Sequence, residues 1–495
     1  MTHSEASTAV VRREQRGDVL LVTIDNPPVN ALGVDVRRGL LAAIEAADAD
    51  PAVAAVLLAG AGRAFIGGAD IREFGKPPQA PALPDVCNRI EVCGKIVVAA
   101  IHGPALGGGL EVALAAHYRM ALPDARLGLP EVHLGLLPGA GGTQRTPRLV
   151  GAGPALDLML SGRHVDAPEA SAMGLVDRVG DGIDPVEAGL AYVRELVAAG
   201  APVRRTRDAD ALSDWERQAA VIETARQDTA KKSRGLFSPL KIVDAVQGAL
   251  ELPFDDGLAL ERQLFLDCLD SPQRTGLVHA FFAEREAAKA PETRSSRARP
   301  IERAGVVGGG TMGAGIAVAL LDAGLPVTMI ERDADALARG RANIDKVYAG
   351  LVAKGRMTAA AQEAVMARWT GSTAYDALAQ ADLVIEAVFE DMDVKTAVFA
   401  ELDRVCKPGA VLATNTSYLD IDRLAATVSR PQDVIGLHFF SPAHIMKLLE
   451  IVVPAKVAPD VVATAFELAK RLRKTPSWRA GAAAPPTTLC SRWTW

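Results

Sequence analysis

Hydrophobic and polar positions follow a repeating pattern over the first 190 residues. Short apolar runs, each closed by glycine or proline, predict buried strands at 19–24, 53–59 and 96–101. Between them, apolar residues at helical spacing over 35–49 predict an amphipathic helix. This alternation predicts an α/β fold for residues 1–190, but periodicity alone does not say how the units stack.

The pattern changes character between residues 191 and 300. Helical spacing recurs in five stretches, at 193–198, 214–229, 239–250, 255–269 and 275–290. The segment 291–300 is polar and arginine-rich and has little to bury, so it is typical of a linker. We therefore expect a helical extension that packs on the first domain and is followed by a flexible connection.

A second alternating pattern begins at residue 301. Strands are predicted at 304–307, 326–331, 382–388, 410–414 and 434–438, with helices between them. This order is typical of a doubly wound parallel sheet over 301–478. Residues 479–495 lack an apolar period, and a disordered tail is expected there.

Composition narrows the class of protein. A chain of 495 residues predicts several domains. The net charge of −6 gives no reason to expect a nucleic-acid partner, and no apolar run is long enough to span a bilayer. Five scattered cysteines favour reduced thiols over disulfides or a metal site. Neither a signal peptide at the start nor a peroxisomal tripeptide at the end (Trp493 to Trp495) is recognised, which predicts a cytoplasmic location.

One glycine-rich stretch carries candidate chemistry. Three glycines at 107–109 open a predicted helix, Glu111 follows them, and Glu131 comes twenty residues later. Bare backbone at a helix N-terminus favours an oxyanion. Two carboxyl groups beside it suit acid and base work on a carbonyl compound.

These residues form part of a wider resemblance. Residues 18 to about 190 resemble the enoyl-CoA hydratase (crotonase) family through the segments 65–71 (FIGGADI), 105–111 (ALGGGLE), 129–131 (LPE) and 138–145 (PGAGGTQR). The resemblance implies a spiral of β-β-α units and a trans-2-enoyl-CoA substrate. It also implies that the N–H groups of Ala69 and Gly108 bind the thioester oxygen. Glu111 would then activate water and Glu131 would deliver the proton to C2, with some isomerase activity through Glu131.

Simpler interpretations of these residues stay open. Glu111 can be an acid that favours the helix dipole, and Glu131 a solvated loop charge. Asp70 is expected to brace the oxyanion loop. His102 and His133 flank the site in sequence and are expected to be packed or surface residues.

A second candidate site follows the strand at 304–307. Gly308, Gly310 and Gly313 form a G-x-G-x-x-G motif that opens a helix, the context of a dinucleotide site. Glu331 ends the next strand and suits a ribose 2′-hydroxyl, which predicts NAD, although the adjacent Arg332 keeps NADP open. The alternative is a glycine-rich turn without a cofactor.

Residues 301 to about 475 resemble the 3-hydroxyacyl-CoA dehydrogenase family, through the segments 414–417 (TNTS), 436–442 (GLHFFSP) and 446–450 (MKLLE). The resemblance implies that His438 is the general base and that Glu450 orients it. Ser417 would bind the substrate oxygen. Three further residues are expected near the cofactor, namely Asn415, Glu386 and Lys395.

The order of these parts resembles the bifunctional enzymes of fatty-acid β-oxidation. That resemblance implies hydration of enoyl-CoA followed by oxidation with NAD. The dehydrogenase family continues into an all-helical domain, so the chain is expected to be truncated and its second activity impaired. One alternative is a hydratase or Δ3-Δ2 isomerase with a vestigial NAD domain; another is a non-catalytic acyl-CoA or NAD binding subunit. Chain-length preference, oligomeric state and a thiolase partner stay open.

Overall fold

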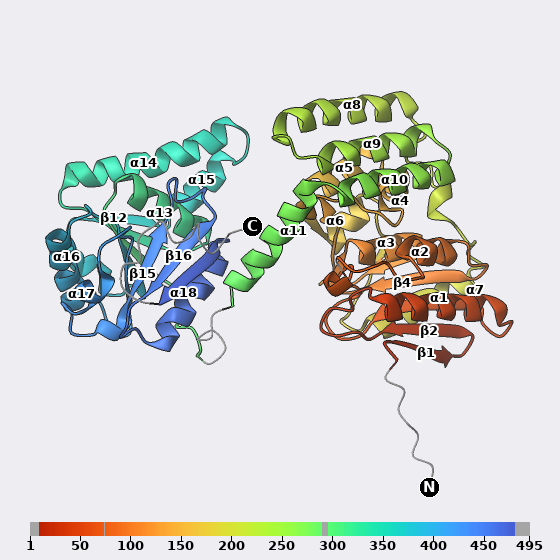
Figure 1. Ribbon diagram of the computed structural model, residues 1–495, viewed down its shortest axis with the longest axis horizontal. Coiled ribbons are helices and arrows are strands. Elements are labelled where there is room, and N and C mark those ends of the chain that lie inside the picture. The colour runs from red at the N-terminus through yellow and green to blue at the C-terminus, as the bar shows by residue number, and fades with distance from the viewer. Residues whose placement is uncertain (1–8, 74, 290–295, 481–495) are drawn as a thin grey trace, which may run out of the picture. The chain divides into compact units, whose positions relative to one another are not determined.

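The computed structural model covers residues 9–73, 75–289 and 296–480 (Figure 1). It forms two compact units, Met1–Ala280 and Phe281–Trp495. The predicted linker at 291–300 therefore lies partly outside the described residues, and the helical stretches up to 269 belong to the first unit. Within the described ranges, no helix combines the length and apolarity needed to cross a bilayer.

The main sheet of the first unit has six strands. Its first pair is antiparallel and the remaining pairs are parallel. The strand order across the sheet is β1 (Val11–Arg16), β2 (Val19–Ile24), β3 (Ala55–Gly60), β4 (Ile96–Ile101), β6 (Tyr118–Ala121) and β9 (Arg178–Val179).

Alternation along these strands divides their side chains between two cores. Leu20 and Val22 of β2 belong to the large core, whereas Val19 and Leu21 point to a smaller one on the opposite face. Helix α1 (Val34–Ala49) packs on the first face and α7 (Pro185–Ala198) on the second (Figure 1). Because both faces are covered there, β2, β3 and β4 are apolar almost throughout, whereas the edge strand β1 (VRREQR) is mostly exposed.

A small second sheet supplies the other layer of the spiral. It contains β5 (Pro104–Leu106), β7 (Arg126–Gly128) and β8 (His164–Asp166). The chain passes from β4 of the main sheet to β5 of the small one and then into α3 (Gly108–Ala115). Isolated bridges, Leu32 to Ala69 and Ile66 to Ala105, extend this layer. The expected stack of β-β-α units is therefore confirmed.

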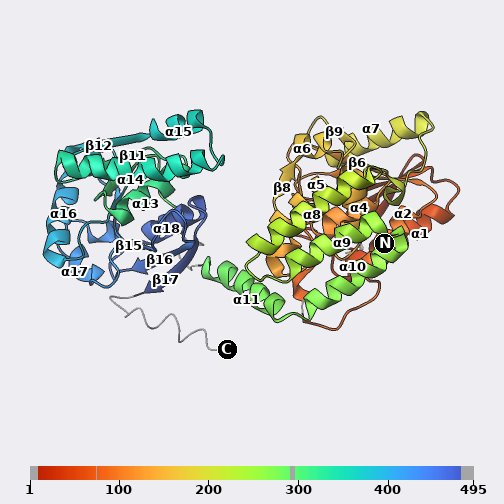
Figure 2. The same ribbon diagram turned by 90° about the horizontal axis from the view of Figure 1, so that it is seen from above.

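The remaining α-helices that begin in this unit include one, the last, that crosses the boundary into the second unit. They are α2 (Leu83–Glu91), α4 (Gly142–Val150), α5 (Ala152–Ser161), α6 (Ala167–Ala172), α8 (Trp215–Lys232), α9 (Ser238–Glu251), α10 (Phe254–Leu269) and α11 (Pro272–Ala287). Helix α9 lies between α8 and α10 and contacts both (Figures 1 and 2). Helices α9 and α10 also contact α4, so the predicted helical extension packs on the hydratase-like spiral.

A buried ion pair ties the site to its surroundings. Glu91 at the end of α2 bonds Arg145 of α4, with Oε2 and Nη2 2.9 Å apart and both side chains fully buried. Arg207 adds a bond to the same oxygen at 3.1 Å. Burial raises the pKa of Glu91, but the two guanidinium groups outweigh it and leave the pKa below its ordinary value.

Removing Glu91 should therefore destabilise the first unit. We expect Glu91→Ala to lower the free energy of unfolding by about 3–5 kcal/mol, because it leaves Arg145 charged and buried without its partner. Denaturant titration followed by circular dichroism measures this. The matched control is Glu195→Ala, which breaks an exposed pair with Arg178 and should cost far less. Equal losses in the two variants would contradict the argument.

The second unit is built on an eight-stranded sheet. Its strands, in spatial order, are β12 (Trp369–Ser372), β11 (Val327–Ile330), β10 (Ala304–Val307), β13 (Leu383–Glu386), β14 (Val411–Thr414), β15 (Val434–Phe439), β16 (Leu448–Val453) and β17 (Thr475–Ala480). The first six strands are parallel to one another. Their order across the sheet is that of a dinucleotide-binding doubly wound fold. This confirms the predicted class.

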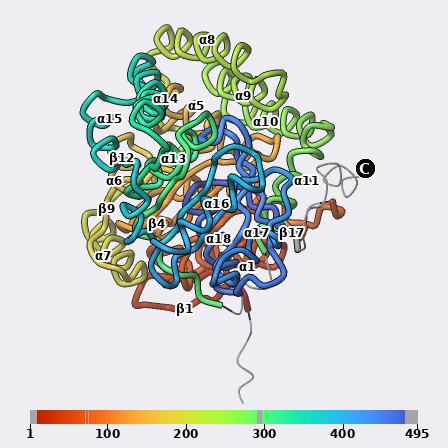
Figure 3. Tube along the Cα trace, turned by 90° about the vertical axis from the view of Figure 1, so that its left-hand side faces the viewer, coloured from red at the N-terminus to blue at the C-terminus, as the bar shows by residue number. Residues whose placement is uncertain are grey.

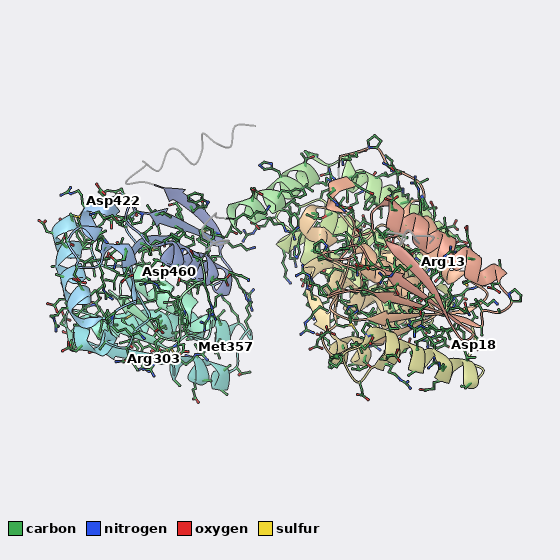
Figure 4. All side chains as sticks on the ribbon, turned by 90° about the horizontal axis from the view of Figure 1, so that it is seen from below. Arg13, Asp18, Arg303, Met357, Asp422 and Asp460 are labelled. Carbon is green, nitrogen blue, oxygen red and sulfur yellow. The ribbon has the colours of Figure 1, made fainter. Side chains whose placement is uncertain are left out.

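Helices cover both faces of this sheet. They are α13 (Thr311–Asp322), α14 (Ala334–Ala353), α15 (Ala359–Met366), α16 (Met392–Val405), α17 (Ile421–Ala425) and α18 (Pro459–Arg471). Helices α14 and α15 lie side by side (Figures 2 and 3). Arg299 anchors the start of the unit through ion pairs with Asp433 and with Asp460 of α18, the latter labelled in Figure 4.

Three strands of this sheet were not predicted, namely β12 at one edge and β16 and β17 on the other side. β16 runs antiparallel to β15, and β17 adds parallel to β16. β17 reaches Ala480, so residues 479 and 480 belong to the sheet rather than to a tail. Backbone pairing with β16 organises this segment even though its side chains show no apolar period. The rest of the predicted tail, 481–495, lies outside the described residues.

Two candidate active sites

The glycine stretch at 107–109 lies against the 65–69 loop. Gly107 has φ +54°, which favours glycine, and α3 begins at the next residue. A Cβ on Gly109 would lie 2.2 Å from the Ile66 carbonyl oxygen, so a side chain is excluded there. A Cβ on Gly108 would lie 4.0 Å from the Ala69 nitrogen. The two predicted oxyanion-binding segments are therefore neighbours.

Glu111 occupies the first turn of α3 and is 3% exposed. Its Oε1 accepts N–H bonds from Ala140 at 2.6 Å and from Gly142 at 2.8 Å. Burial raises the pKa of Glu111 above its ordinary value, although these two donors and the charge of Arg145 offset part of the rise. Because both donors reach one oxygen, the other oxygen is left for a further partner.

Glu131 begins a short 3-10 turn, Glu131–Leu134. Its Oε1 lies 2.9 Å from the position of a Cβ on Gly107, which places the carboxyl group against the glycine stretch. Its Oε2 is buried and has no hydrogen-bond partner in the part of the chain that the structure describes. Burial and then the charge of Glu111 raise the pKa of Glu131 well above its ordinary value. The two acids thus sit in unlike environments: Glu111 Oε1 accepts two N–H bonds from the 140–142 turn, whereas Glu131 Oε2 is buried without a partner among the described residues.

Sequence analysis missed a third buried acid. Glu261 of α10 accepts N–H bonds from Gly141 at 2.7 Å and from Thr143 at 3.0 Å, and the Thr143 hydroxyl donates to it at 2.6 Å. The sequence does contain an indication of it: Glu261 falls at helical spacing between Gly257 and Leu264, on the buried face of α10. A lone acid at such a position is unusual.

Three other residues near the motif make contacts away from the two acids. Both oxygens of Asp70 bond the Arg72 side chain, and one also accepts the Arg72 N–H, which holds the turn that follows the oxyanion loop. His102 Nε2 contacts the Gly62 carbonyl oxygen at 3.0 Å. His133 packs against Gly162. None of these contacts reaches Glu111 or Glu131.

In the second unit the glycine motif forms the turn between β10 and α13. Gly308 has φ +100°, and a Cβ on Gly313 would lie 1.8 Å from the Gly308 carbonyl oxygen, so both positions require glycine. A Cβ on Gly310 would meet nothing within 4 Å. That open position at a helix N-terminus fits a pyrophosphate, which approaches bare backbone.

Glu331 lies beside this turn. Its Oε1 accepts the Gly309 N–H at 2.7 Å and its Oε2 accepts the Arg332 N–H at 3.0 Å. The Arg332 side chain pairs with Asp333 and is exposed. A carboxylate at this place fits a ribose hydroxyl and repels a 2′-phosphate, so these residues fit NAD.

His438 on β15 faces Glu450 on β16 in the antiparallel register. His438 Nδ1 is 2.7 Å from Glu450 Oε2, and Nε2 is 3.3 Å from the Ser417 hydroxyl oxygen. His438 and Glu450 are twelve residues apart in the sequence because the chain leaves β15, turns back and returns as β16, which pairs with it. The structure brings all three residues together.

The remaining predicted residues are placed differently. Asn415 Oδ1 accepts the Phe439 N–H at 2.8 Å, which ties its loop to β15. Glu386 and Lys395, predicted to line the cofactor cleft, are 0% and 1% exposed and bond each other at 2.7 Å. Two opposite charges buried together offset part of the cost of losing their solvation. Their place beside the cofactor stays a prediction.

Glu390, which sequence analysis missed, lies nearer the surface in the same cluster. It bonds Lys395 at 3.2 Å and accepts the Ser417 N–H at 2.7 Å. Burial raises its pKa, but its hydrogen bonds and Lys395 outweigh burial and lower it overall. Glu390 therefore positions the loop that carries Ser417.

Comparison with known proteins agrees with this geometry. Residues 14–232 match the family model described as enoyl-CoA hydratase/isomerase, and residues 303–478 match 3-hydroxyacyl-CoA dehydrogenase, NAD binding domain. The second unit is therefore an NAD-binding domain.

Similar relatives carry both parts. The peroxisomal bifunctional enzyme of Danio rerio is 43% identical over 465 residues, and that of Homo sapiens 40% over 462. Each alignment covers 92% of this chain and 63% of the relative. The peroxisomal fatty acid beta-oxidation multifunctional protein of Oryza sativa subsp. japonica is 37% identical over 470 residues, covering 92% and 65%.

The chain thus spans just under two thirds of the length of these curated relatives. Both of its matched segments occur in the order predicted from the sequence. The chain belongs to the family of bifunctional enzymes that join an enoyl-CoA hydratase/isomerase domain to the NAD-binding domain of a 3-hydroxyacyl-CoA dehydrogenase.

Proposed function

We propose that the first unit hydrates trans-2-enoyl-CoA to L-3-hydroxyacyl-CoA and that the second oxidises this product to 3-oxoacyl-CoA with NAD, as steps of fatty-acid β-oxidation. The observation that carries the proposal is a pair of acids in unlike environments beside the glycine stretch: Glu111 is buried and bonded by two N–H groups, and Glu131 has a buried Oε2 without a partner among the described residues. Pairs of titratable groups whose surroundings separate their pKa values are typical of acid and base partners.

Glu111 is the base of this proposal. Its orientation is fixed by the N–H groups of Ala140 and Gly142, and its second oxygen takes a proton from water. The water oxygen bonds C3 of the substrate, and the electron pair of the double bond moves onto the thioester oxygen. The N–H groups of Ala69 and Gly108 would hold the resulting negative charge, a contribution of roughly 3–4 kcal/mol per donor to lowering the barrier.

Glu131 is the acid. Burial and the charge of Glu111 raise its pKa well above the ordinary value, which favours the protonated carboxyl group. When the enolate electrons return to C2, Glu131 supplies the proton that bonds there. A proton then passes from Glu111 back to Glu131 before the next turnover. Moving a double bond without adding water also requires proton transfer at C2, which Glu131 could perform. Δ3-Δ2 isomerisation is therefore the second candidate activity of the same site.

In the second unit His438 takes the proton of the 3-hydroxyl group. The glycine turn and Glu331 would hold NAD, which would supply the hydride acceptor for C3. Ser417 bonds the substrate oxygen, while Glu450 holds the His438 ring and balances the charge that it gains. Glu386, Lys395 and Glu390 support the 414–417 loop from inside the unit.

Each half is tested separately. Loss of enoyl absorbance from crotonyl-CoA without NAD tests hydration, and formation of NADH from L-3-hydroxybutyryl-CoA tests oxidation. A chain that hydrates but forms no NADH would support the alternative of a vestigial NAD domain. A chain inactive in both assays would support a non-catalytic binding subunit.

The location and partners of the chain stay predictions. The cytoplasmic location predicted from the sequence differs from the names of the three relatives, which are all called peroxisomal. Those names support a peroxisomal location for this chain as well. Acyl-CoA thioesters are the proposed substrates, and a thiolase partner and an oligomer stay open.

A further inference from the structure

One turn of backbone is shared between two buried carboxyl groups. The N–H groups of Ala140 and Gly142 donate to Glu111, and those of Gly141 and Thr143 donate to Glu261. Four consecutive N–H groups at the start of α4 thus point alternately to two acids on opposite sides. Neither acid can move without changing the turn that holds the other.

Helix α10 is fitted closely to this turn. A Cβ on Gly139 would lie 2.5 Å from the Phe265 ring, and a Cβ on Gly257 would lie 2.2 Å from Gln144 Oε1. Glu261 itself is 2% exposed. The carboxyl group is therefore an internal partner of the turn and is not reached by solvent.

A buried carboxyl group is an unfavourable acceptor for a purely structural hydrogen bond, because burial disfavours its ionised form. Burial and the charge of Glu111 raise the pKa of Glu261 to about 8, so it is neutral at neutral pH. A neutral Glu261 still accepts N–H bonds, and it leaves the partial positive charge of the α4 N-terminus to the Glu111 carboxylate. An ionised Glu261 would compete with Glu111 for that charge.

We propose that Glu261 is a positioning residue of the hydration site: it fixes the 140–143 turn so that Ala140 and Gly142 hold the Glu111 carboxylate toward the reacting water. This inference rests on the proposed hydration activity. Glu261 acts through Glu111 and does not itself contact substrate. Titratable groups on four neighbouring elements interact electrostatically with Glu261. They are Glu111 of α3, Glu131 of the 3-10 turn, Arg145 of α4 and Cys87 of α2.

The test uses Glu261→Gln in the full chain. The amide replaces one acceptor oxygen by a donor and cannot ionise, so the turn loses a bond and the charge never forms. We expect kcat for crotonyl-CoA hydration to fall by up to about 100-fold, because small displacements of a catalytic group have effects of that size. KM should change little, since the oxyanion segments are untouched.

The pH profile separates positioning from simple structural support. In the wild-type chain, Glu261 ionises near pH 8 and its charge raises the pKa of Glu131. Without that charge Glu131 loses its proton at lower pH, so the alkaline limb of kcat should move to lower pH in Glu261→Gln. A profile that keeps its limbs, or an unchanged kcat, would overturn the proposal.

Two further variants guard against misfolding. Thr143→Val removes one hydroxyl bond to Glu261 and keeps its volume, and a smaller fall in kcat at unchanged KM is expected. Asp256→Asn removes an exposed acid from the same helix and should leave hydration at the wild-type rate. An unchanged kcat in Thr143→Val, or an equal fall in Asp256→Asn, would contradict the proposal. A wild-type chain without hydration activity would instead defeat the proposed function itself.

Discussion

Replacing Glu131 by glutamine is expected to lower hydration turnover by about 10²- to 10⁴-fold, the usual contribution of a positioned acid or base. The buried Oε2 without a partner among the described residues and the raised pKa support our proposal that Glu131 donates the proton to C2. An amide of the same shape keeps the packing against Gly107 but has no acidic proton to give.

The measurement is loss of enoyl absorbance in Glu131→Gln, with Glu45→Gln on α1 as an exposed control. Oxidation of L-3-hydroxybutyryl-CoA by the second unit should keep its wild-type rate in both. Glu111→Gln should also lose hydration but retain Δ3-Δ2 isomerisation through Glu131. Isomerisation that survives in Glu131→Gln and disappears in Glu111→Gln would reverse our assignment of the two acids.

Replacing His438 by glutamine is expected to lower NADH formation by about 10²- to 10⁴-fold. In our proposal His438 is the base, because its Nε2 faces Ser417 while its Nδ1 contacts Glu450. Its replacement should therefore stop proton removal and leave the glycine turn intact. NAD affinity and hydration should therefore stay at wild-type values.

Glu450→Gln refines this prediction. It leaves His438 in place but removes the negative charge that favours the protonated ring, so NADH formation should fall less than in His438→Gln. Glu467→Gln on α18, an exposed acid of the same unit, is the control. A His438→Gln chain that forms NADH at the wild-type rate would show that another group takes the hydroxyl proton.

Local pattern was sufficient for the elements with the strongest periodicity. The runs at 19–24 and 96–101 are β2 and β4 with the predicted bounds, because strands buried on both faces must be apolar throughout. The G-x-G-x-x-G motif was found because tight turns require glycine wherever φ is positive or backbones approach. Such signals lie within a few residues of each other.

Features that depend on residues distant in the sequence could not be predicted from local pattern. Glu386 and Glu390 are four residues apart and alike in type, and only the fold shows that the first is buried against Lys395. Glu261 meets the 140–143 turn from a helix more than a hundred residues away. Long-range contacts of this kind leave no periodic trace in the sequence.

We propose that the two units of this chain catalyse consecutive reactions. One coupled reaction tests it most directly: purified full chain, crotonyl-CoA and NAD, with enoyl absorbance and NADH followed together. We predict that enoyl absorbance falls and NADH appears, and that Glu131→Gln abolishes both signals while His438→Gln abolishes only NADH. No fall in enoyl absorbance with several acyl chain lengths would contradict the assignment of Glu111 and Glu131 as a working pair.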